Sequence, residues 1–166
     1  YAIAEKDKVK RRLIDSALNY YFYNYEELYV KPQGRDLQSS EKYIKAILMY
    51  RTGLASGNDT TKQMMAASSY SILSMVLSDT AKTGVKSYQR VQDMYFNGKS
   101  YQQAYGILEL KRNKLAGVLN SRDLYFEGRC LASMGKNAEA LKIYQELVTN
   151  DTNYLTGYYL IATTWA

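Results

Sequence analysis

The sequence predicts an all-α fold, and three observations support this prediction. The 166 residues include one proline and ten glycines, too few for a fold built from strands and tight turns. Apolar residues recur at helical spacing, as in the stripe Ile14, Ala17, Leu18 and Tyr21. Clusters that contain glycine and asparagine divide the chain into segments of helix length. We therefore expect about seven helices.

The first expected helix is long, spanning residues 3–29. It begins with a basic cluster at residues 6–12 and continues into an aromatic run at residues 20–25. Aromatic side chains all round a helix would require cover on more than one face. Pro32 and Gly34 then interrupt the helical pattern.

Further helices follow at regular intervals. The second is expected to end near residue 55, with Ser39 or Ser40 as its cap, and the third to span residues 61–80. The next covers residues 85–97. Ser100 and Gln103 match a capping box, which would begin a helix that ends near residue 120.

Residues 121–154 carry the clearest pattern in the chain. Large residues stand at Leu124, Leu131 and Tyr144, and small ones at Gly128 and Ala140. Gly128 in the first helix is expected to let the second helix cross closely. Ala140, a small residue of the second helix, is expected to lie opposite. This 34-residue pattern resembles the tetratricopeptide repeat (TPR), a helix–turn–helix unit that stacks into a solenoid.

The resemblance implies a right-handed α-solenoid of TPR-like antiparallel helix pairs. Residues 85–120 and 121–154 would form two repeats, and 155–166 would start a further one. Residues 1–84 would form an N-terminal helical region with degenerate units.

Several residues outside the clearest repeat depart from the family pattern or match it only in part. Gln92 stands where a small residue is usual, and Lys111 is a second departure. Met64, Ala67 and Ser68 resemble the first helix of a degenerate unit.

In solenoids of this family the first helix of each pair lines a concave face, where partner peptides or helices usually bind. Arginine and tyrosine are residue types that dominate interface energetics. The implied partner is another protein, with an acidic or carboxylate-bearing segment favoured. The alternative is that these residues are an ordinary solvated face. The positions carried over are Lys86, Gln89, Asp93, Phe96, Arg122, Tyr125, Arg129 and Tyr159, with Lys62, Met65 and Ser69 in the least regular unit.

The composition argues against an enzyme and against bound cofactors or metals. The chain has no histidine, so the commonest general base and metal ligand are missing. Its single cysteine, Cys130, lies among apolar neighbours and is expected to be a buried small hydrophobe. No glycine-rich phosphate loop is present in a strand–helix context. No segment approaches the roughly 18 apolar residues of a membrane span.

Charge leaves a second function open. The net charge of +6 and the basic cluster at residues 6–12 are compatible with a nucleic-acid-binding helical module. Interleaved Glu5 and Asp7 favour a solvated helix face instead. The tyrosine-rich, histidine-free composition and the start at Tyr1 favour an exported bacterial protein, within an envelope or appendage assembly.

The last expected helix is apolar nearly all round. Terminal repeats normally carry a polar outer face, because nothing stacks on them. We therefore expect that the chain continues past Ala166 or that another subunit covers this helix. The apolar residues include Leu155, Tyr158, Ile161 and Trp165.

Overall fold

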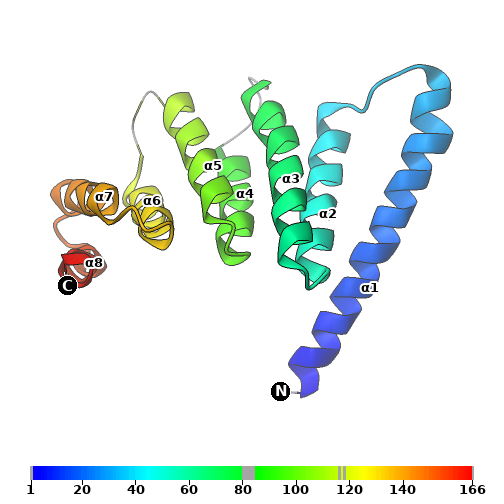
Figure 1. Cartoon of the computed structure of the whole chain (residues 1–166). Helices are drawn as coiled ribbons and strands as arrows, with labels where there is room; N and C mark the ends of the chain where they lie inside the picture. Colours follow the sequence, from blue (N-terminus) through cyan, green and yellow to red (C-terminus); the bar gives the residue numbers. More distant parts are fainter. Residues whose placement is uncertain (1, 80–84, 116, 118, 166) are drawn as a thin grey trace. The chain divides into compact units, whose positions relative to one another are not determined.

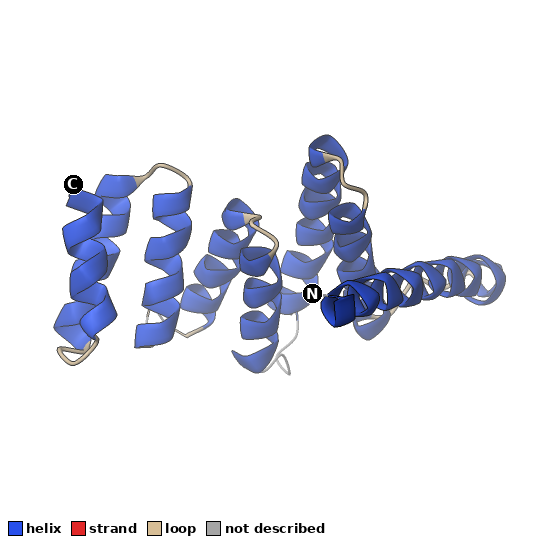
Figure 2. Ribbon diagram, turned by 90° about the horizontal axis from the view of Figure 1, so that it is seen from below, coloured by secondary structure: helices blue, strands red, loops and turns tan. Residues whose placement is uncertain are grey.

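The computed structural model describes residues 2–79, 85–115, 117 and 119–165. Every regular element among these residues is helical, so the all-α expectation is confirmed (Figures 1 and 2). The described residues form eight α-helices, one more than expected. The chain divides into two compact units, Tyr1–Ala81 and Lys82–Ala166.

The first unit contains α1 (Ala2–Tyr25), α2 (Ser39–Ala55) and α3 (Asp59–Asp79). Helices α2 and α3 form the closest pair of this unit, joined by a short turn (Figure 1). A Cβ atom built on Gly53 of α2 would lie 3.1 Å from Cγ of Met65 in α3. The absence of a side chain at residue 53 therefore lets the two helices approach.

Helix α3 packs on α2 through a face that leaves Met64, Ala67 and Ser68 exposed. The buried face instead includes Ser69, whose hydroxyl donates a 2.8 Å hydrogen bond to the carbonyl of Ala46. A partner protein cannot reach Ser69, because its side chain is fully buried between these helices.

The regular part of α1 ends before the expected residue 29. A π-helical turn, Glu26–Val30, and a 3-10 turn, Lys31–Gln33, follow it. Gly34 stops the helical path with a left-handed φ of 65°, a conformation that glycine adopts without strain. Among the side chains that the structure describes in this unit, the expected cover on several faces of α1 is not found. Ile14, Leu18 and Tyr21 are 48%, 45% and 68% exposed.

The second unit contains five helices, each packed on the next along the chain. These are α4 (Val85–Asn97), α5 (Tyr101–Lys114), α6 (Ser121–Ser133), α7 (Asn137–Asn150) and α8 (Leu155–Trp165). Helices α4 and α5 form one hairpin and α6 and α7 form a second (Figure 1). Helix α5 ends earlier than the expected residue 120.

Two of the expected helix caps are wrong. Ser100 precedes α5 but makes no capping hydrogen bond, because its backbone, with ψ 67°, does not take the extended form of a cap. A capping box does form at α2, where Gln38 has an extended ψ of 163° and pairs with Glu41. The cap of α2 is thus Gln38 rather than Ser39 or Ser40.

The close packing expected within residues 121–154 is confirmed. Leu131, Ala140 and Tyr144 form one buried cluster between α6 and α7. A Cβ atom on Gly128 would lie 2.6 Å from Cδ1 of Tyr144, so the ring occupies the space of the missing side chain. Cys130 is buried as expected, and this burial raises the pKa of its thiol to about 12.

Lys111 and Gln92, the two departures from the repeat pattern, are both buried. Nζ of Lys111 lies 2.5 Å from Oδ2 of Asp123, joining α5 of one hairpin to α6 of the next. A buried pair must keep both charges together, so it restricts how the hairpins stack. Gln92 is 1% exposed, and its side-chain amide has no hydrogen-bond partner in the described part of the chain.

Candidate functional site

The candidate site is a row of aromatic rings across α4, α6 and the turn before α8. Phe96 of α4 meets Phe126 of α6 edge-to-face, with ring centroids 4.8 Å apart. Tyr125 lies 5.2 Å from Phe126 and 6.1 Å from Tyr154, again between ring centroids. We call these four residues the aromatic row. All four are half-buried, so each ring is fixed by packing yet keeps part of its surface accessible.

Two arginines flank the row because of helical spacing along α6. Arg122 lies one turn before Phe126, and its guanidinium carbon is 4.9 Å from that ring centroid. Arg129 lies one turn after Tyr125, 5.7 Å from that ring centroid. Its Nη1 also donates a 2.9 Å hydrogen bond to the Tyr125 hydroxyl oxygen. Both arginines are therefore held over aromatic faces, where cation–π attraction stabilises them.

The two arginines differ in whether a carboxylate of the protein neutralises their charge. Nη2 of Arg122 donates to both carboxylate oxygens of Asp93, at 3.0 and 2.9 Å. Its charge is thus already matched within the protein. Arg129 forms no ion pair with any residue in the ranges that the structure describes. Among the described residues, Arg129 is therefore the cation of the site that has no carboxylate partner.

The structure brings together part of the expected partner-binding set. Phe96, Arg122, Tyr125 and Arg129 lie in or beside the aromatic row. Asp93 pairs with Arg122 beside the row, whereas Lys86, Gln89 and Tyr159 have no contact with it in the part of the chain that the structure describes. Lys86 and Tyr159 are exposed on α4 and α8, and Gln89 is half-buried on α4.

Two members of the aromatic row were missed by the repeat pattern. Phe126 follows Tyr125 directly and stands four residues after Arg122, a spacing that indicates contact with the guanidinium. Tyr154 lies in the turn between α7 and α8. Helical spacing cannot predict the neighbours of a residue outside a helix. Partial burial raises the pKa of Tyr154.

Among the described residues, no group of three or more cysteine, aspartate or glutamate side chains could hold a metal ion. None of the helices in the described ranges is long and apolar enough to cross a membrane. Comparisons with known protein families, curated protein sequences and solved structures find no match for this chain.

Proposed function

We propose that the α4–α8 part of the chain is a non-enzymatic protein-interaction module, which binds a peptide or helix of a partner protein. The aromatic row with its two arginines carries this proposal. A few residues carry most of the binding energy of a protein interface, and tyrosine and arginine are enriched among them. Here they are held in place before binding, which lowers the entropic cost of association.

The proposed partner segment contains a carboxylate, from an acidic residue or a chain end. Arg129 supports this choice, because no carboxylate of the described residues neutralises it. A guanidinium beside an aromatic ring can hold a carboxylate through two parallel hydrogen bonds. Asp93 would keep Arg122 in position but would repel an acidic group placed directly on it.

The proposal extends to the architecture and its setting. We infer a TPR-like, right-handed α-solenoid, in which α4 and α6 are the first helices of successive repeats and line the concave face. The contacts of Asp93 and Phe96 with α6 support this, because first helices of neighbouring repeats should touch each other. A scaffold of this kind within a bacterial envelope or appendage assembly fits the tyrosine-rich composition.

Peptide display followed by a charge reversal tests the proposed function. Random peptides selected on the protein should be enriched in aspartate, glutamate or a free carboxyl end. Binding of a selected peptide, measured by fluorescence anisotropy, should weaken at least about tenfold in Arg129→Glu. Lys142→Glu on α7 makes the same charge change away from the row and should leave affinity unchanged. Equal affinity for both variants would refute the assignment.

Nucleic-acid binding is the second candidate, supported by exposed Lys10 and Arg12 on α1. Phosphate contacts would make affinity fall steeply with salt. A mixed-sequence duplex that shows no salt-sensitive binding to the wild-type protein would exclude it.

A further inference from the structure

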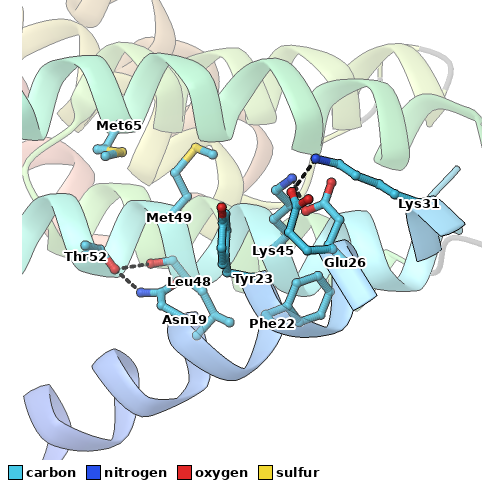
Figure 3. A pocket seen from close by; sticks show the side chains of 11 residues that line it. Asn19, Phe22, Tyr23, Glu26, Lys31, Lys45, Leu48, Met49, Thr52 and Met65 are labelled. Atoms are coloured by element: carbon cyan, nitrogen blue, oxygen red, sulfur yellow. Dashed lines mark hydrogen bonds and ion pairs between the residues drawn. The ribbon is translucent and has the colours of Figure 1, made fainter. Parts of the chain in front are cut away.

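The first unit contains a cavity of about 350 Å³ between α1, α2 and α3 (Figure 3). The residues that line this cavity lie between positions 19 and 65, and none of them belongs to the aromatic row. Its volume falls within the range of about 300–1,000 Å³ that is usual for small-molecule sites. The cavity lining includes Phe22, Tyr23, Leu48, Met49 and Met65.

Several polar contacts join α1 to α2 around the cavity. Nη2 of Arg51 lies 3.0 Å from Oδ1 of Asp15, and Asn19 donates a hydrogen bond to the hydroxyl of Thr52. Nζ of Lys45 lies 2.5 Å from Oε2 of Glu26 further along the helix. These contacts hold α1 against α2. The cavity lies between the Asn19–Thr52 hydrogen bond and the Glu26–Lys45 ion pair, whose residues all line it.

An irregular helix segment shapes one end of the cavity. The π-helical turn begins at Glu26, and both Glu26 and Glu27 line the cavity beside it. Lys31, in the following 3-10 turn, folds back to pair with Glu27. Single π-helical turns are rare and occur frequently at functional sites.

The lining determines which chemistry fits. Phe22, Leu48, Met49 and Met65 supply an apolar wall, and methionine adapts its shape to different apolar groups. The charged residues of the lining neutralise one another, because Glu26 pairs with Lys45 and Glu27 with Lys31. A charged ligand would have to break one of these pairs. A neutral ligand leaves both intact.

We propose that this cavity binds a neutral, mostly apolar small molecule that carries a single hydrogen-bonding group. A cavity of about 150 Å³ holds one benzene ring, so this one has room for about two fused rings. The polar group would reach the Asn19 and Thr52 end, where uncharged donors and acceptors line the cavity (Figure 3).

Binding would also strengthen the attachment of α1. A ligand in the cavity contacts Phe22 from α1 and Met49 from α2 at once, and so adds an apolar interface to the polar contacts. A ligand that binds only the docked arrangement stabilises that arrangement. Ligand binding and the docking of α1 are therefore coupled.

The test uses 1-naphthol as a neutral two-ring probe and 1-naphthalenesulfonate as its charged counterpart, each titrated by calorimetry. Met49→Trp places an indole in the cavity and should weaken 1-naphthol binding at least about tenfold. Met64→Trp makes the same change at an exposed site on α3 that does not line the cavity, and affinity should be retained. Circular dichroism checks that both variants are folded.

A measurement on the wild-type protein makes the proposal testable without any variant. Saturating 1-naphthol should slow amide hydrogen exchange in α1, while the sulfonate should bind more weakly and give less protection. The proposal is overturned if Met49→Trp binds as tightly as wild type, if the sulfonate binds equally well, or if exchange in α1 is unchanged. The first of these results would indicate adsorption to exposed apolar surface elsewhere. None of these outcomes depends on Arg129, so this proposal and the peptide-binding proposal fail separately.

Discussion

Replacing Lys111 by methionine is expected to destabilise the second unit strongly. Its ammonium lies 2.5 Å from the carboxylate of Asp123, and the two side chains are only 3% and 1% exposed. In Lys111→Met the carboxylate would stay buried without its cation. Breaking a buried pair in this way costs about 3–5 kcal/mol. The loss is a large share of the roughly 5–15 kcal/mol that stabilises a typical domain.

The double variant separates the lost partner from the lost packing. In Lys111→Met with Asp123→Leu, both charges are gone and apolar groups fill a similar volume. Such replacements of whole buried pairs are often neutral or stabilising. We therefore expect the double variant to be more stable than the single variant by several kcal/mol, with a stability close to that of wild type.

Hydrogen exchange in urea, followed by mass spectrometry on peptides of α5–α7, reports the free energy of unfolding of this region. The control is Lys136→Met, which removes an exposed pair with Glu139 at 3.6 Å. Exposed pairs contribute at most about 1 kcal/mol, so this loss should be small. The reasoning would be refuted if Lys111→Met cost no more than Lys136→Met, or if the double variant were as unstable as the single one.

Two further predictions concern a close helix contact and a perturbed carboxylate. Gly128→Ala should lower the free energy of unfolding by about 1–3 kcal/mol in urea denaturation, because the 1% exposed Tyr144 ring blocks a Cβ. A neutral or stabilising result would mean that the ring can move and that alanine's helix propensity, about 1 kcal/mol, dominates. Hydrogen bonds from Arg35 and then Tyr25 lower the pKa of Glu41 to about 2. Because its ordinary pKa is 4.5, the stability from this ionised carboxylate should be lost as pH falls from about 4.5 to 2. Carbon-13 titration of the side chain checks this, and an ordinary pKa there would contradict the hydrogen-bond network.

The hairpin of α6 and α7 could be predicted because its determinants are close in sequence. Gly128 and Tyr144 stand on either side of one turn, and Gly135 in that turn takes a φ of 78°. A small residue opposite a large one implies a close crossing whatever surrounds the hairpin. Local spacing likewise placed Arg122 and Arg129 on one helix with Tyr125.

The docking of α1 could not be predicted in the same way. The apolar stripe of Ile14, Leu18 and Tyr21 indicated a buried face, yet the helix meets α2 through Asp15, Asn19 and other polar groups. Helical periodicity shows which side chains share a face. It does not show which other helix approaches that face, because a helix rich in aromatic residues offers several apolar faces.

The sequence by itself determined the helical class, the main helices and the residues that share a face of α6, since these depend on spacing within one helix. Only the tertiary structure decided which cations remain available. Asp93 neutralises Arg122 across 29 residues of sequence, Asp123 pairs with Lys111 between hairpins, and Arg129 is left without such a partner in the described chain. Charge pairing depends on which helices come into contact, and that is set by packing of the whole unit.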